Sequence, residues 1–162
     1  MASTTFSGPV TSTNGFIGAL TGNVTGNVTG NVTGTVANTE LTAASTLTAA
    51  QSGTTFFLNS ATEFATTLPA PAAGITYTFI VKTAPSGASY TVVTASSANI
   101  IKGQQYNAAG AAGDTGTADD TITFVDGSAV AGDMVIVISD GTSWFARAYC
   151  AVAAGVTFTQ AS

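Results

Sequence analysis

The sequence contains no histidine and a single cysteine, Cys150, and these two scarcities remove most of the usual catalytic and metal-binding chemistry. Histidine is the commonest general base and the commonest transition-metal ligand. One cysteine cannot form an internal disulfide, a structural zinc site or a Cys–His nucleophile pair. We therefore expect no catalytic residues, no cofactor and no bound transition metal.

Charge is also scarce, because charged side chains make up 7% of the 162 residues and only three of them are basic. Soluble domains usually carry about 25% charged residues. Lys82, Lys102 and Arg147 are too few to form a nucleic-acid footprint or to attract an anionic membrane surface. No apolar run is long enough for a transmembrane helix. The N-terminal residues lack the basic and apolar regions of a secretory signal, which predicts synthesis and folding in a cytoplasm.

The carboxylates suggest little chemistry of their own. Glu40 and Glu63 are the only glutamates and lie far apart in the chain, so a glycosidase pair would have to come from scattered aspartates. The segment GDTGTADD (113–120) places Asp114, Asp119 and Asp120 close together, but their spacing does not match an EF-hand. A solvated acidic loop is the favoured interpretation, and a Ca²⁺ site is the alternative.

The most regular stretch is TGNVTGNVTGNVTGTV at residues 21–36. In an extended chain, side chains alternate between two faces. The apolar residues of the repeat, and those in the same register before it, then share one face: Phe16, Leu20, Val24, Val28, Val32 and Val36. Glycine at every fourth position disfavours a helix.

A lone ribbon of this kind cannot bury its valine face. The favoured interpretation is an arm that docks on a partner or winds with its own copies, since the apolar register is regular. A flexible low-complexity linker is the alternative, and a spiral of short turns remains open.

The remainder of the chain has the pattern of an all-β body. About eight short strands, separated by turn signals and without a helical period, predict an antiparallel β-sandwich or jelly-roll-like fold. Asp140 and Gly141 predict a hairpin. Residues 104–120 predict a long surface loop, and residues 65–74, with Pro69 and Pro71, an edge or a loop.

Two strands near the C-terminus are informative about burial. Residues 134–138 are apolar at every position, which predicts a central strand covered on both faces. We expect a core that includes Phe79, Ile136, Val137 and Trp144. The next strand places Phe145, Arg147 and Tyr149 on one face, where the arginine could stack on the two rings and contact another subunit. An amphipathic stem covering a core edge is an equally good interpretation.

Three stretches of the chain resemble structural proteins of tailed-phage virions. GFIGALTGNVTGNVTGNVTG (15–34) is similar to the short repeats of phage head-fibre and tail-fibre proteins. TLPAPAAGITYTFIV (67–81) and GDMVIVISDGTSWF (132–145) resemble the β-rich bodies that accompany such repeats. The resemblance implies a symmetric homo-oligomer, usually a trimer, with no catalytic residues.

The short chain favours a capsid decoration (cement or head-fibre) protein of a bacteriophage, located on the capsid surface of the virion. Its expected partners are the major capsid protein and its own copies. The alternative is a receptor-binding tail fibre or spike that contacts the host cell surface. We expect residues 1–40 to form the attachment or oligomerisation arm, 41–53 a neck and 54–162 the body.

Overall fold

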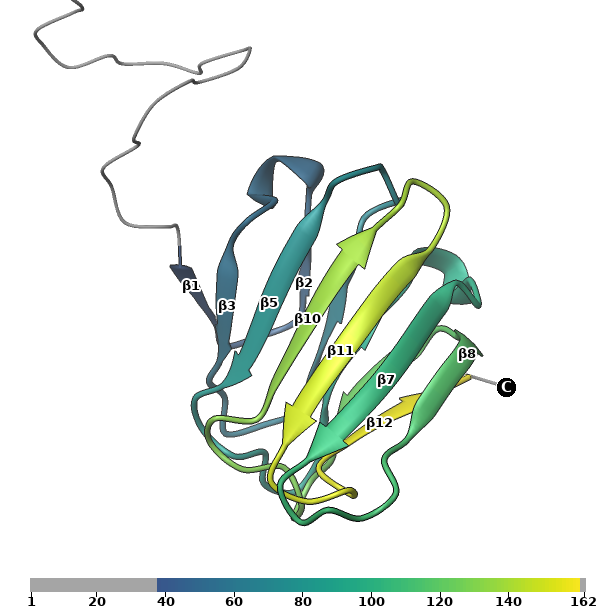
Figure 1. Ribbon diagram of the computed structural model, residues 1–162. Coiled ribbons are helices and arrows are strands. Elements are labelled where there is room, and N and C mark those ends of the chain that lie inside the picture. The colour runs from purple at the N-terminus through teal and green to yellow at the C-terminus, as the bar shows by residue number, and fades with distance from the viewer. Residues whose placement is uncertain (1–37, 161–162) are drawn as a thin grey trace, which may run out of the picture. The chain divides into compact units, whose positions relative to one another are not determined.

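The structure is a computed structural model that describes residues 38–160, and these residues form two mixed β-sheets (Figure 1). The seven-stranded sheet consists, in spatial order, of β1 (Asn38–Leu41), β3 (Thr55–Leu58), β5 (Thr76–Val81), β10 (Met134–Ser139), β11 (Trp144–Cys150), β7 (Ile101–Asn107) and β8 (Thr115–Asp119). The five-stranded sheet consists of β12 (Val156–Thr159), β9 (Thr121–Phe124), β6 (Tyr90–Val93), β4 (Phe64–Thr67) and β2 (Ser45–Thr46).

The all-β prediction is confirmed, but the prediction of an antiparallel body is wrong for half of the strand pairs. Five of the ten pairs are parallel and five are antiparallel. From β1 to β6 the chain crosses from one sheet to the other after every strand. The next strand in the same sheet therefore runs in the same direction, so β1, β3 and β5 are parallel, as are β2, β4 and β6. Side-chain alternation marks the buried face of a strand but not the direction of its neighbour.

The predicted neck, residues 41–53, and the last residues of the predicted arm, 38–40, are built into the two sheets. Leu41, at the end of β1, is 7% exposed, and Leu47, which follows β2, is 2% exposed. The short 3-10 helix η1 (Ala49–Gln51) then leads towards β3. The hydroxyl of Tyr77 donates a hydrogen bond of 2.8 Å to the carbonyl of Thr48. These contacts explain why β1 and β2 stay attached to the body although they are short.

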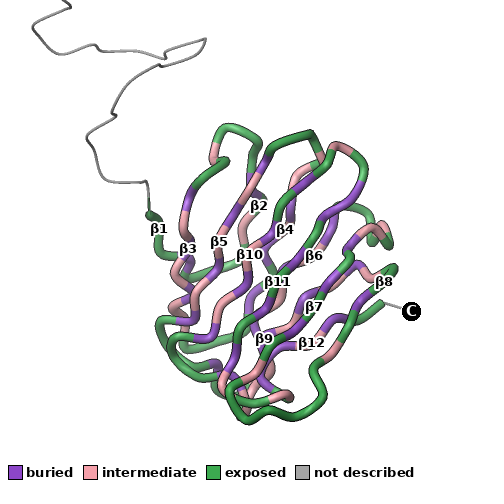
Figure 2. Tube along the Cα trace, viewed as in Figure 1, coloured by how far each residue is buried: buried purple, intermediate pink, exposed green. Residues whose placement is uncertain are grey.

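Both sheets contribute to one hydrophobic core. Buried and exposed residues alternate along the strands, as the colours in Figure 2 show. Phe79, Val137 and Trp144 are fully buried, as predicted, and the Trp144 ring lies 5.9 Å from that of Tyr77. Ile136 is only half-buried, so its prediction as a core residue is wrong. Its side chain points away from the core because β10 places only every second residue inward.

The turn between β10 and β11 is the predicted hairpin. The two strands pair antiparallel from Met134 opposite Tyr149 to Ser139 opposite Trp144. Gly141 has a φ of +102°, which favours glycine. The Asp140 carboxylate accepts hydrogen bonds from the backbone N–H groups of Thr142 (2.8 Å) and Ser143 (2.7 Å), and these bonds hold the pKa of Asp140 below its ordinary value.

Two loop predictions change in detail. Residues 104–107 belong to β7 and residues 115–119 to β8, so only residues 108–114 of the predicted loop 104–120 connect the two strands. The residues 65–74 begin within β4, which lies between β2 and β6 and is not an edge strand. Pro69 and Pro71 fall after the strand has ended, in agreement with the missing N–H donor of proline.

Candidate interaction surface

The side of the seven-stranded sheet that faces away from the core is unusually apolar, and we call it the outer face. Along β11 the inward residues are buried, whereas Phe145, Arg147 and Tyr149 are exposed. The same alternation on β7 exposes Lys102, Gln104 and Tyr106. The strand register brings eight large apolar side chains onto the outer face: Phe57, Ile80, Tyr106, Met134, Ile136, Ile138, Phe145 and Tyr149.

One row of the outer face crosses five adjacent strands without a charge. Tyr106 lies opposite Tyr149, Tyr149 opposite Met134, Met134 opposite Ile80, and Ile80 opposite Phe57. Neighbouring strands lie about 4.8 Å apart, so the row is about 19 Å long. Tyr106 is 52% exposed and Tyr149 is 44% exposed. The other three residues of the row are half-buried: Met134, Ile80 and Phe57. Nothing within residues 38–160 covers this row.

The prediction of β10 as a doubly covered strand is therefore wrong within the described residues. Val135 and Val137 are fully buried in the core, but Ile138, on the opposite side, is 51% exposed. Met134 and Ile136 are half-buried on that same side. A strand with apolar residues on both sides usually lies between two layers. Here only one of the two layers is part of the described chain.

The predicted contact residues Phe145, Arg147 and Tyr149 lie together on the outer face, but their mutual contacts differ from the prediction. The Tyr149 ring stacks on Tyr106, with centroids 5.6 Å apart and an interplanar angle of 19°. The cation above an aromatic ring is Lys102, whose Nζ lies 5.3 Å from the Phe145 centroid. Arg147 instead donates a hydrogen bond of 3.1 Å from Nη1 to the carbonyl of Ala146.

All three basic residues of the chain lie at the outer face. Lys102 and Arg147 point outward from β7 and β11, and Lys82 follows β5. Lys82 forms an ion pair with Glu40 of β1, and Asn59 Nδ2 donates a second hydrogen bond of 3.0 Å to the same carboxylate. Both bonds lower the pKa of Glu40. Lys102 and Arg147 form no ion pair within residues 38–160.

The opposite side of the body has a different character. Threonine dominates the outward positions of the five-stranded sheet, and the strand register aligns these residues in rows: Thr91, Thr121, Thr123, Thr157 and Thr159. The rows are completed by Thr46, Thr67, Val93 and Ala65, and no charged side chain interrupts them. The two sides of the body thus differ in both charge and apolar content.

The acidic segment near β8 is held by backbone contacts. The Asp114 carboxylate accepts hydrogen bonds from the N–H groups of Thr115 (2.8 Å) and Phe158 (2.7 Å). Asp120 accepts one from the Thr121 hydroxyl at 2.7 Å. Among the described residues, no group of three or more potential ligands is arranged to hold a metal ion. Asp114 therefore fastens β12 to the loop before β8.

Asp119 provides a test of pH dependence. Its Oδ2 is buried without a hydrogen-bond partner in the described structure, and burial, with the charges of Asp114 and Asp120, raises its pKa. The folded protein binds this proton more tightly than the unfolded chain, so stability should fall as the pH rises through the raised pKa. We expect Asp119→Asn to raise Tm at pH 7 by roughly 2–4 °C and to have little effect below pH 4.

Calorimetry across this pH range measures the effect, with Asp126→Asn as a control that removes the same charge from another half-buried aspartate. An equal rise in Tm for the two variants at pH 7 would show that net charge, and not the buried oxygen, is responsible.

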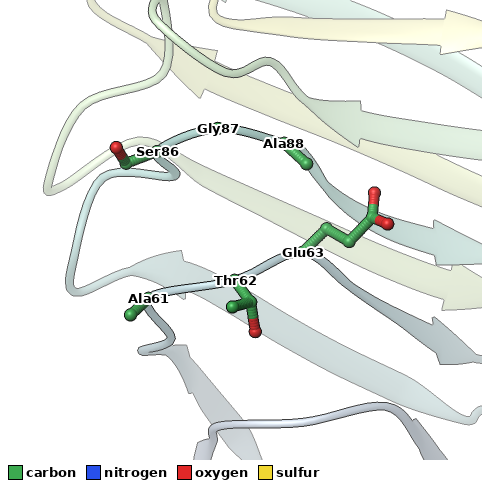
Figure 3. A pocket seen from close by; sticks show the side chains of 6 residues that line it. All are labelled: Ala61, Thr62, Glu63, Ser86, Gly87 and Ala88. Atoms are coloured by element: carbon green, nitrogen blue, oxygen red, sulfur yellow. The ribbon is translucent and has the colours of Figure 1, made fainter.

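A small hollow lies between two neighbouring loops, away from the outer face (Figure 3). It is lined by Ala61, Thr62, Glu63, Ser86, Gly87 and Ala88. Glu63 is its one ionisable side chain, and the other five residues are small. A single exposed carboxylate beside small side chains provides neither a nucleophile–base pair nor a set of convergent ligands. The outer face is therefore the better candidate for a functional site.

No protein-family model, curated protein or solved structure matches the chain. No helix among residues 38–160 is long and apolar enough to cross a membrane. The predicted arm contacts at Phe16, Leu20, Val24, Val28, Val32 and Val36 lie outside the described residues.

The outer face is larger than the sequence indicated. Sequence periodicity did not predict three of its residues, Tyr106, Ile80 and Phe57. Each comes from a different strand, and only the register between strands brings them into one row with Tyr149. The available signals were the unbroken apolar run of β10, which implied a second covering layer, and the adjacent apolar residues Phe56–Phe57 and Phe79–Ile80, which break the alternation of their strands.

Proposed function

We propose that the protein is a structural component of a bacteriophage virion that decorates the capsid shell. In this proposal the β-rich body is a sandwich that assembles as a homotrimer, and the N-terminal arm attaches it to the major capsid protein. The observation that carries the proposal is the uncovered outer face of the seven-stranded sheet. The virion setting comes from the resemblance of the repeat and of the two β-rich stretches to phage structural proteins.

The size of the outer face supports an assembly role. Seven strands about 4.8 Å apart and about 20 Å long give a footprint of about 600 Å². A standard protein–protein interface buries about 800 Å² of accessible surface on each partner, and a corrugated face of side chains exposes more than its footprint. Exposed apolar patches of a few hundred Å² are often functional. The outer face is thus of the right size for a stable contact.

The residue chemistry also favours assembly over catalysis. The sequence has no histidine, and the buried Asp133 carboxylate accepts hydrogen bonds from two backbone N–H groups. Aromatic residues and arginine are the types enriched at protein interfaces, and Tyr106, Tyr149, Phe145 and Arg147 supply them here. A contact surface requires aromatic and arginine side chains, but it does not require a residue that transfers a proton.

The test is decoration of shells that lack the protein. Purified protein mixed with such shells should add a regular layer of density in electron micrographs, with a copy number that saturates. Shells that already carry the protein are the matched control and should bind no more. Failure to bind empty shells, together with saturable binding to host cells, would replace the proposal by the receptor-binding alternative.

A further inference from the structure

The middle of the outer face is purely aliphatic. β10 is the fourth of the seven strands in spatial order, and its outward side chains are Met134, Ile136 and Ile138. No charged or aromatic residue belongs to this column. A surface that meets its own copy at a symmetry axis must tolerate contact between identical side chains. Aliphatic side chains meet that condition, because they neither repel nor require a hydrogen-bond partner.

The two flanks of the column differ from each other in a complementary way. One strand away from β10, Tyr149 lies on one side and Ile80 on the other, in the same row. In the next row Arg147 and Thr78 occupy the equivalent positions on the two sides of Ile136.

The same relation continues one strand further out. Tyr106 and Phe57 are each two strands from Met134, on opposite sides. On the β11–β7 flank Tyr149, Arg147 and Tyr106 thus have an apolar or hydroxyl group at the mirrored position on the β5–β3 flank: Ile80, Thr78 and Phe57.

We infer that the outer face is covered by the outer face of a second copy of this chain, related by a rotation axis that runs parallel to β10. Such a rotation places the β11–β7 flank of one copy against the β5–β3 flank of the next. Tyr149 then packs on Ile80, and Arg147 meets Thr78. A two-fold axis in this direction gives this pairing over the whole face, and a three-fold axis brings the same two flanks together with the sheets inclined to one another. The inference rests on the self-association that the proposed function requires, and it names the surface and the symmetry direction.

Charge argues against the other arrangements. A two-fold axis perpendicular to the strands would place β11 on β11, and such an axis at the level of Ile136 would set Arg147 against Arg147, where like charges oppose association. The threonine side of a second copy lacks the large apolar side chains needed to cover Ile138 and Tyr149. The chain as a whole has a net charge of −5, yet its three basic residues all lie at the outer face. Lys102 and Arg147 make the outer face positive in both copies, so a contact between two outer faces must keep these cations apart. The axis parallel to β10 keeps the arginines apart by placing Thr78 opposite Arg147.

Cysteine cross-linking of the full chain tests the axis. The native thiol is first removed by Cys150→Ala, which keeps a small apolar side chain at this buried site. In that background, Ile136→Cys should form covalent dimers with a short bis-maleimide, because the two residues meet at the axis. Arg147→Cys and Thr78→Cys should each cross-link weakly alone and several-fold more when the two variants are mixed and reassembled. Ala65→Cys, on the exposed side of the five-stranded sheet, is the control and should remain monomeric.

Native mass spectrometry of the same samples reports whether the chain associates at all. Cross-linking of Arg147→Cys with itself, without a gain on mixing, would show an axis across the strands and overturn the inference. Oligomers in which neither Ile136→Cys nor the mixed pair cross-links would overturn it as well. If the wild-type chain is monomeric the inference also fails, while binding of that monomer to empty shells would leave capsid decoration standing.

Discussion

Replacing Asp133 with alanine is expected to lower the free energy of unfolding by about 2–5 kcal/mol, because two backbone N–H groups would lose the buried carboxylate that accepts their hydrogen bonds. Asp133 is 3% exposed. Its Oδ1 accepts a hydrogen bond of 2.8 Å from the N–H of Ala151, and its Oδ2 accepts one of 3.0 Å from Val130. The side chain thus ties the turn before β10 to the end of β11. Urea denaturation monitored by Trp144 fluorescence measures the change as a lower midpoint at constant m.

A matched variant separates the lost hydrogen bonds from the lost charge. Asp126→Ala removes the same charge from a half-buried residue of the turn after β9, and it should change stability by less than about 1 kcal/mol. The loss of stability in Asp133→Asn should lie between those of the two alanine variants, since the amide oxygen of asparagine can still accept one of the two hydrogen bonds. If Asp133→Ala and Asp126→Ala unfold at the same midpoint, the structural role assigned to Asp133 is wrong.

Deleting residues 1–36 is expected to leave a folded, soluble body that no longer binds capsid shells. The first described strand, β1, begins at Asn38, so the deletion removes none of the paired strands or core residues of the described structure. The arm has an apolar register but little apolar surface for its length, and ordering each residue costs about 1–2 kcal/mol of backbone entropy. A shell surface would cover the valine face of the arm, and the glycines would let the backbone of the arm approach that surface closely.

The measurement is sedimentation of shells with bound protein, at a protein concentration that saturates binding of the full chain. Replacing Val24, Val28 and Val32 together with serine should weaken binding in the same direction without shortening the chain. The truncated body should still self-associate, since the outer face remains intact. Full occupancy of shells by the truncated body would disprove the attachment role of the arm and make it a spacer or an oligomerisation stem.

The strands were easier to predict than their arrangement. Alternation in residues 76–81 and 144–150 follows directly from the period of a strand with one buried side, and both segments are strands. The parallel pairing of β3 with β5 was not predictable from alternation, because the intervening β4 belongs to the other sheet. β1 and β2 were missed since they contain only one large apolar residue, Leu41, and their stability comes from pairing with β3 and β4.

The candidate surface was predictable only in part, for a related reason. Phe145, Arg147 and Tyr149 share a face of one strand, and a single strand is within reach of sequence periodicity. Ile80 joins that face through its pairing with Met134, which lies more than 50 positions further along the chain, and Phe57 joins it through its pairing with Ile80. Such pairings depend on the topology of the whole sheet.

The order of strands in the seven-stranded sheet has a consequence for the way the chain folds during synthesis. β5 pairs with β10, which is synthesised more than 50 residues later, and β7 likewise pairs with the later strand β11. Until the ribosome has released residues 134–150, the inner edges of β5 and β7 have no partner strand in this sheet, and unpaired edges invite intermolecular pairing. Contacts between residues so distant in the chain also form slowly. A nascent chain that stalls before β10 therefore exposes the unpaired edges of both β5 and β7. The β10–β11 hairpin is the element that pairs with both edges.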